Sequence, residues 1–243
     1  MSLLRVYVVS TGWAHATKQL CMASVASQLD VEAVHIYIEA SEQNPPKTKI
    51  QNLVEAIAPL PPESIVVFLD GDDFLSHKRA LARVAQAHAE GMWLTYGSFC
   101  NSDGTPGFAS EYGPNEDYRA THWRLTHLKS CRAGLFQRLR KEDLMYPCDA
   151  QGRCVLQGPA VGMRWIDRAD DPAFFIPCAE QAGRGRVQWL RDVLYVYDLA
   201  NAWHQTASQA ELEHQAAIMA LTRARPPYQR IDSLTQRKLR AAR

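Results

Sequence analysis

The sequence of 243 residues has no internal repeat, no low-complexity segment and no pair of cysteines in C-x-x-C spacing. These absences exclude a repeat array and remove the usual sequence sign of a small metal or redox module. The longest apolar runs, such as residues 65–69, are only as long as a strand, so we expect no membrane-spanning segment. The first residues also lack the apolar stretch and cleavage site of a secretory signal.

Net charge is also nearly absent, because 27 basic residues against 26 acidic ones give +1. This balance excludes a generally polyanion-binding surface, although it says nothing about local patches. Among the six cysteines, Cys148 and Cys154 are close enough in sequence to close a small loop. A chain of this length does not need disulfides, so we expect a reduced, cytoplasmic protein. The 47% hydrophobic and 22% charged residues are typical of a globular chain.

The first hundred residues alternate between strand and helix patterns. Apolar runs predict strands at residues 3–9, 34–38, 64–69 and 93–99, and helical spacing predicts helices at 14–28, 50–57 and 76–89. The run at 64–69 is apolar throughout, which is typical of a strand covered on both faces of a sheet. Together these elements predict an α/β fold with a Rossmann-like, mostly parallel central sheet flanked by helices.

The pattern changes after residue 100. Residues 101–115 are rich in Gly, Pro, Ser and acidic side chains and predict a long loop, and residues 121–141 are basic and aromatic. Further on we expect a helix at 171–182, a strand at 187–197 and a helix at 208–223. The tail from 222 to 243 carries seven basic residues against one acidic residue.

Three carboxylates, Asp70, Asp72 and Asp73, directly follow the apolar strand at 64–69. Ligands of open α/β sheets bind at the carboxyl ends of the strands. Three carboxylates so close together repel one another unless a cation or a proton relieves them, and oxygen ligands suit Mg²⁺ or Mn²⁺. The pattern therefore favours a divalent ion that holds a phosphorylated ligand. The alternative is an acidic turn in which one Asp caps the next helix.

A strand that ends in V-V-F-L-D-G-D-D-F-L, in a chain that begins with a strand and a Ser/Thr turn, resembles the family 2 glycosyltransferases with the GT-A fold. The further stretches that resemble this family are residues 49–57, 126–136, 171–183 and 193–198. The resemblance implies a GT-A domain over 1–205, with a nucleotide-sugar half (1–100) and an acceptor half (101–205). A C-terminal helix and basic tail would occupy 206–243.

The resemblance also implies roles in binding the donor sugar nucleotide. Asp70 would contact the ribose, and Asp72 would ligate Mn²⁺ or Mg²⁺ together with His204, which follows the closing strand and is as readily a loop histidine. The remaining donor-binding candidates are Ser10, Thr11, Lys49, Gly71, His127 and Arg132. Lys49 is alternatively a solvated helix lysine, and the basic–aromatic strip that contains His127 and Arg132 is alternatively a buried Trp beside solvated arginines.

Inverting sugar transfer needs a base that takes the proton of the acceptor hydroxyl. By resemblance Asp171 occupies that position, with Asp170 beside it and Glu180 as a second choice. Carboxylates at a helix N-terminus are also common as caps, so a structural role for Asp171 stays open.

The sequence therefore predicts a metal-dependent, inverting hexosyltransferase that uses a nucleotide sugar, most simply a UDP-sugar. Its acceptor would be a glycan, a lipid-linked glycan, a protein or a modified pyrimidine base of DNA. The basic tail would suit DNA or an anionic membrane surface, or it is simply a solvated end. Two other classes stay open: a non-catalytic nucleotide- or carbohydrate-binding module, and a nucleotidyltransferase, although no glycine-rich, lysine-bearing loop near the N-terminus supports the latter.

Overall fold

The computed structural model describes residues 4–12, 17–40, 46–201 and 206–235, and it has a mixed α/β fold, as the sequence predicts. The strands are β1 (Arg5–Gly12), β2 (Glu32–Glu39), β3 (Ile65–Phe68), β4 (Phe74–Leu75), β5 (Leu94–Asn101), β6 (Lys129–Arg132), β7 (Met145–Cys148), β8 (Gly162–Trp165) and β9 (Val187–Tyr197). The α-helices are α1 (Lys18–Ala26), α2 (Lys49–Ile57), α3 (Ala80–Ala89), α4 (Ala133–Phe136), α5 (Asp170–Ala182) and α6 (Gln209–Ala224). Short 3-10 turns are η2 (Lys141–Leu144), η3 (Arg184–Arg186) and η4 (Leu199–Asn201).

The central sheet has seven strands in the order β2-β1-β3-β6-β5-β9-β4. Strands β2, β1, β3, β5 and β9 point the same way, whereas β6 and β4 run antiparallel to their neighbours. The insertion of β6 between β3 and β5 was not predicted. It places residue Lys129 directly beside Phe68, at the carboxyl end of β3.

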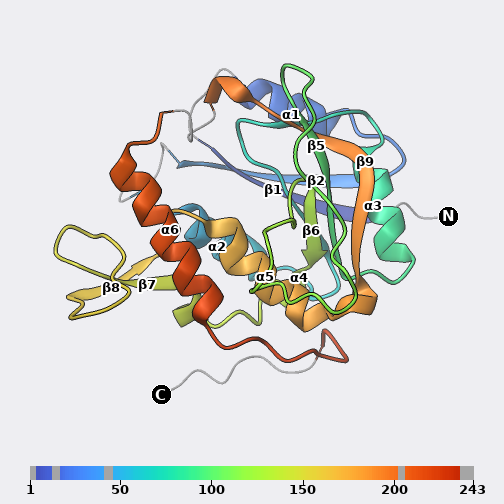
Figure 1. Ribbon diagram of the computed structural model, residues 1–243. Helices are drawn as coiled ribbons and strands as arrows, with labels where there is room; N and C mark the ends of the chain where they lie inside the picture. Colours follow the sequence, from blue (N-terminus) through green and yellow to red (C-terminus); the bar gives the residue numbers. More distant parts are fainter. Residues whose placement is uncertain (1–3, 13–16, 41–45, 202–205, 236–243) are drawn as a thin grey trace.

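Helices cover both faces of this sheet, with α2, α4, α5 and α6 gathered on one side (Figure 1). Strand β3 explains why two layers form, because its side chains alternate between the two cores. Val66 and Phe68 pack with α2 and α5, whereas Ile65 and Val67 pack with α1 and α3. A strand that is apolar at every position therefore occupies the middle of the molecule, as expected.

Several boundaries differ from the sequence prediction. The third helix begins at Ala80 and not near 76, because residues 74–75 form β4 and pair with β9. Asp73 accordingly does not cap that helix. All six cysteines are free thiols, and Cys148 and Cys154 meet only through a backbone bridge. Within the described ranges, each helix is too short or too polar to traverse a bilayer.

An aromatic cluster joins α5 to the sheet. Phe174 is fully buried, and its ring lies 4.8 Å from that of Phe68 and 5.5 Å from that of Phe136. Each ring comes from a different element, β3, α4 or α5, so the cluster fixes the helix on the sheet.

Replacing Phe174 by Ala should lower the free energy of unfolding by about 3–5 kcal/mol, because it leaves a cavity where three elements meet. Urea denaturation measures this change. Phe108→Ala is the control: its side chain is 58% exposed, so it should change stability by about 0.5 kcal/mol or less. Equal effects of the two substitutions would contradict the packing described here.

Candidate functional site

Two lysines and three aspartates from four elements meet at the carboxyl end of β3. The Lys49 Nζ atom, at the start of α2, lies 2.6 Å from Asp70 Oδ1 and 3.0 Å from Asp170 Oδ2. It also lies 3.5 Å from Asp171 Oδ1. The Lys129 Nζ atom, from β6, lies 2.7 Å from Asp171 Oδ2. We call these five residues the lysine–aspartate cluster.

Local signals place these side chains. Thr48 caps α2 with a reciprocal capping box to Gln51, which starts the helix at Lys49 and fixes the direction of the Lys49 side chain. Helix α5 begins with Asp170 and Asp171, where acidic side chains are favoured by the helix dipole. Asp70 follows the last residue of β3 by two positions, so its carboxylate lies at the carboxyl end of that strand.

Opposite charges decide the protonation of the cluster. Burial alone would raise the pKa of Asp70, but the Lys49 ammonium outweighs it and the pKa is lowered. Burial acts against the ionised Asp171 in the same way, yet Lys129 and Lys49 hold its pKa well below the usual range. Asp170 differs, because burial and the neighbouring carboxylates raise its pKa in spite of Lys49. Asp171 is therefore ionised at neutral pH, and the charges of two lysines stabilise it.

The Lys129 side chain is only 2% exposed and has a second partner, the Nδ1 atom of His127 at 2.9 Å. Burial and the Lys129 charge lower the pKa of His127 to about 3, so the ring is neutral at pH 7. A neutral ring that accepts from Lys129 at Nδ1 carries its proton on Nε2. The ring also stacks on Tyr195, with centroids 4.4 Å apart.

Tyr195 connects this network to the acidic turn. Its hydroxyl donates to Asp73, which also accepts from the backbone N–H of Asp198 at 2.6 Å. Burial and the charges of Asp70 and Asp72 raise the pKa of Asp73 to about 8. Asp73 therefore holds the turn against β9, and Asp72 stays half-buried beside it.

The turn itself is packed tightly against the end of β1. The Gly71 N–H donates to the carbonyl oxygen of Thr11 at 3.1 Å. A Cβ atom on Gly71 would lie 2.8 Å from the Gly12 Cα atom, so only glycine fits. The Thr11 hydroxyl is buried and has no hydrogen-bond partner among the described residues. Ser10, in contrast, is fully buried, and its hydroxyl is within 2.9 Å of His35 Nε2.

A cavity of about 650 Å³ opens beside the lysine–aspartate cluster. It is lined by Phe99, Asn101, Pro106, Gly107, Phe108, Trp123, Thr126, His127, Lys129, Asp171, Tyr197, Leu199 and Gln215. Its charged members, Lys129 and Asp171, neutralise each other. The cavity therefore offers aromatic faces and amide groups around one ionised carboxylate.

Two of the predicted site residues lie elsewhere. Arg132 is at the far end of β6, opposite Ile65, and it donates to the carbonyl oxygens of Glu63 and His88. Glu180 lies on the last turns of α5 in a bidentate ion pair with Arg119, at 2.6 and 2.8 Å. It also accepts from the backbone N–H of Tyr228. His204, which the sequence predicts as a metal ligand, lies outside the described residues.

The sequence analysis did not select Lys129 as a site residue. A lysine in the sequence K-S-C-R gives no sign of burial, and strand β6 was not predicted. In the described part of the chain, no group of three or more His, Cys, Asp or Glu side chains is arranged to hold a metal ion.

The sheet order and this site at the carboxyl ends of its strands define the chain as an α/β protein with a GT-A-like fold. Among solved structures, it is similar to Staphylococcus aureus TarS residues 1–349 in complex with UDP-GlcNAc, with a TM-score of 0.54 and 14% identity. That match covers 90% of this chain and 65% of the other. A second TarS crystal structure gives a TM-score of 0.51 at 14% identity, over 88% of this chain and 39% of that one. No protein-family model and no curated protein sequence matches the chain.

The Lys129 charge should control the protonation of Asp171. In Lys129→Met we expect the pKa of Asp171 to rise, because the nearest cation is lost. A carboxyl group whose pKa is lower in the folded chain than in the unfolded chain stabilises the folded state at pH values above its unfolded pKa. This stabilisation is lost as the pH falls through the folded pKa. The variant should therefore also be less stable at neutral pH. Titration of the Asp171 carboxyl carbon by NMR measures the pKa directly.

Lys47→Met is the matched control, because Lys47 is an exposed lysine paired with Glu55. It should leave the Asp171 titration unchanged. An Asp171 titration that is identical in wild type and Lys129→Met would refute the proposed coupling.

Glu180→Ala should destabilise the protein by about 3–5 kcal/mol, because it leaves the Arg119 guanidinium, only 8% exposed, without its partner. Glu116→Ala removes an ion pair of similar geometry with Arg124, but that pair is more exposed and should cost about 1 kcal/mol or less. Urea denaturation compares the two. An unchanged stability in Glu180→Ala would reopen a catalytic role for this residue.

Proposed function

We propose that this chain transfers a sugar from a nucleoside diphosphate sugar to an acceptor hydroxyl, with Asp171 as the base. The observation that carries the proposal is the ionised Asp171 carboxylate at the wall of an aromatic cavity, held by Lys129 and Lys49. The fold shared with TarS, which was crystallised with UDP-GlcNAc, supports a UDP-sugar as donor. The chain spans only part of those TarS structures, so the whole reaction stays a proposal.

Each residue of the site has a distinct part in this proposal. The acceptor hydroxyl attacks the anomeric carbon and gives its proton to Asp171 as the bond to the leaving diphosphate breaks. Attack opposite the leaving group inverts the configuration. Lys49 would meet a phosphate oxygen of the donor, and drawing this cation toward the diphosphate would raise the pKa of Asp171 toward that of a working base. Thr11 and Asp70, at the ends of β1 and β3, would contact the nucleoside.

Asp72 is the described residue that we propose to hold Mg²⁺ or Mn²⁺. A half-buried carboxylate at the end of a central strand has the oxygen donors that these ions prefer. Since the described residues form no cluster of three ligands, diphosphate oxygens would complete the site, as is common for Mg²⁺. When bound, the ion would supply Lewis-acid neutralisation of the leaving diphosphate.

The cavity favours an acceptor with a neutral ring. Trp123 and Tyr197 offer faces on which a sugar ring packs, and Asn101 and Gln215 offer amide groups to its hydroxyls. Because Lys129 and Asp171 compensate each other, no net charge in this lining selects an ionic acceptor. A glycan hydroxyl is therefore our proposed acceptor.

Donor binding and turnover test the proposal separately. We expect UDP-GlcNAc or another UDP-sugar with Mn²⁺ to stabilise the protein by about 2.7 kcal/mol at about 100 times its Kd. Asp171→Asn should keep this thermal shift but lower UDP release by about 10²-fold or more, because the proton acceptor is lost. Lys47→Met is the control for both assays.

The outcomes separate the classes of protein. Nucleotide-dependent stabilisation without UDP release, across a panel of glycan acceptors, would indicate a binding module. Undiminished turnover in Asp171→Asn would show that another group is the base. No stabilisation by any sugar nucleotide, with or without metal, would refute the proposal.

A further inference from the structure

The hairpin of β7 and β8 projects from the body of the molecule (Figure 1), and one face of its ladder is apolar, whereas the other carries Arg164 opposite Tyr146. Residues directly opposite each other in the ladder share a face. Tyr146 and Cys148 lie on the inner face and are buried in the core. Met163 pairs with Pro147, and Trp165 pairs with Met145, so these four form the outer face.

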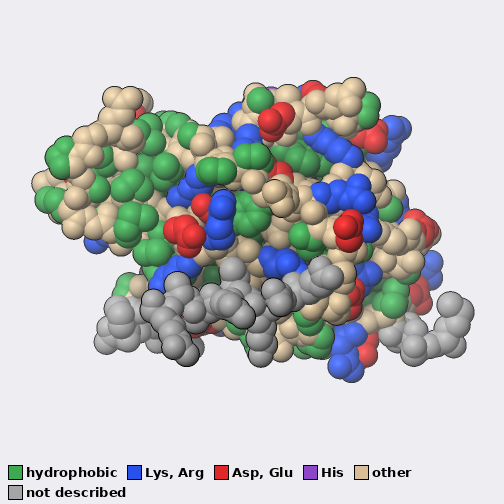
Figure 2. Space-filling view, turned by 90° about the horizontal axis from the view of Figure 1, so that it is seen from below, with side chains coloured by type: hydrophobic (Ala, Val, Ile, Leu, Met, Phe, Trp, Pro, Cys, Tyr) green, Lys and Arg blue, Asp and Glu red, His purple; other side chains and the backbone are tan. Residues whose placement is uncertain are grey.

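The outer face and the loop of the hairpin expose large hydrophobic side chains. Val161 is 72% exposed, and Leu156 and Met163 are each 52% exposed. We call these three residues the hairpin patch. Figure 2 shows hydrophobic side chains spread over this lobe of the molecule. Single exposed apolar residues are ordinary, but three within eight residues on a projecting hairpin that adjoins an apolar cavity make a candidate interaction surface.

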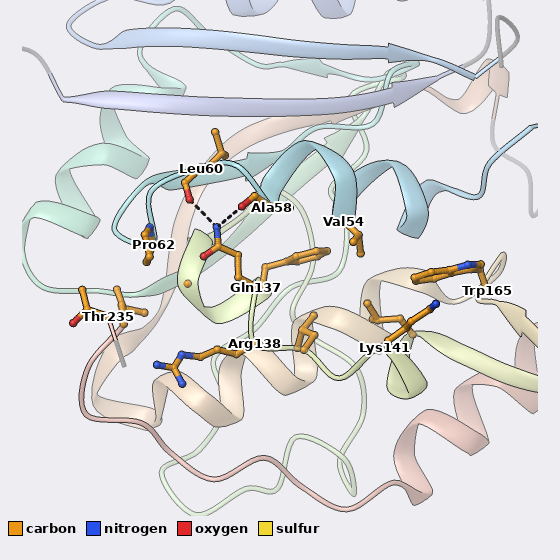
Figure 3. Close-up of a pocket in the computed structure, with 14 residues that line it drawn as sticks. Val54, Ala58, Leu60, Pro62, Gln137, Arg138, Lys141, Trp165 and Thr235 are labelled. Atoms are coloured by element: carbon orange, nitrogen blue, oxygen red, sulfur yellow. Dashed lines mark hydrogen bonds between the residues drawn. The ribbon is translucent and has the colours of Figure 1, made fainter. Parts of the chain in front are cut away.

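Strand β8 ends at a preformed apolar cavity of about 690 Å³ (Figure 3). Trp165 lines it at the end of β8, and Val54, Leu60 and Leu144 are among the nine apolar side chains of its fourteen lining residues. Its wall is held in place by Gln137, whose amide donates to the carbonyl oxygen of Leu60 at 2.7 Å. The volume falls in the roughly 300–1,000 Å³ range of small-molecule sites.

The charge around this surface is positive. Among the described residues, the charged ones that line the cavity are Arg138 and Lys141, and none is an Asp or a Glu. Lys141 lies over the Trp165 ring, with Nζ 5.5 Å from its centroid. From residue 138 to 165 there are five basic residues and three acidic ones. A ligand that complements this surface has a long apolar part and an anionic group.

We propose that the hairpin patch docks on a bilayer that contains anionic phospholipid, and that the cavity beside Trp165 receives an acyl chain. The patch would enter the boundary between head groups and acyl chains, where apolar side chains are favoured. Lys141 and Arg138 would face the anionic head groups, whose surface potential attracts them. This is a surface association of a folded chain and does not depend on the function proposed above.

Vesicle sedimentation tests the docking. The wild-type chain should sediment with vesicles of phosphatidylcholine and phosphatidylglycerol, and much less with phosphatidylcholine alone. The triple variant Leu156→Ser, Val161→Ser, Met163→Ser should bind about tenfold or more weakly, because it removes the inserted apolar surface. The matched control is Leu20→Ser, Met22→Ser, Leu29→Ser, which changes three side chains of similar exposure near α1 and should bind normally.

Lipid-dependent quenching tests the cavity. Phosphatidylglycerol with brominated acyl chains should quench tryptophan fluorescence, and Trp165→Phe should remove the quenched component. Trp93→Phe, which changes a half-buried tryptophan stacked on Arg186, should keep it. Quenching that persists in Trp165→Phe would overturn the assignment of the cavity.

Other results would overturn the docking itself. Equal sedimentation with charged and uncharged vesicles would exclude the anionic lipid. An equal loss in the two triple variants would exclude the hairpin as the docking element. If the wild-type chain fails to sediment and is a dimer that only the hairpin variant dissociates, the patch is an interface between two copies.

Discussion

The lysine–aspartate cluster is the interaction on which the arrangement of the site depends. Asp70, Asp170 and Asp171 are partly buried within a few ångströms of one another, and such carboxylates repel unless cations compensate them. Lys49 is in ion-pair distance of all three, and Lys129 pairs with Asp171 from the other side. The cluster connects the end of β3, the start of β6 and the first turns of α2 and α5. Its ion pairs and the positions of these elements therefore stabilise each other.

The topology of the sheet explains how this balance is reached. Strand β6 enters antiparallel between β3 and β5, and its first residue therefore lies beside the last residue of β3. The aromatic cluster around Phe174 holds α5 against the same strand. Asp171 and Lys129 thus meet at 2.7 Å although 42 residues separate them in the chain. From Lys129 the contacts continue through His127 and Tyr195 to Asp73 in the acidic turn.

The two cavities of the structure described above differ in the charges that line them. The aromatic cavity beside Asp171 is electrically balanced, which suits the recognition of neutral rings around one reactive carboxylate. The cavity beside Trp165 is apolar with two cations and is lined by Val54 from the second half of α2, whereas Lys49 is at the N-terminal end of that helix. A single helix therefore contributes to this cavity and to the lysine–aspartate cluster.

The sequence by itself determined the fold class, most strands and helices of the central sheet, and the acidic turn after β3, because apolar periodicity and capping are local properties. Residues Asp70, Asp171 and Lys49 could be selected from it, since their motifs surround them in the chain. The burial of Lys129, the ion pair of Glu180 and the remote position of Arg132 were decided by the tertiary structure. The surroundings of these three side chains depend on which carbonyl group or charged side chain, distant in the sequence, lies next to them in the fold. Strand order and helix packing decide this, and neither is a local property of the sequence.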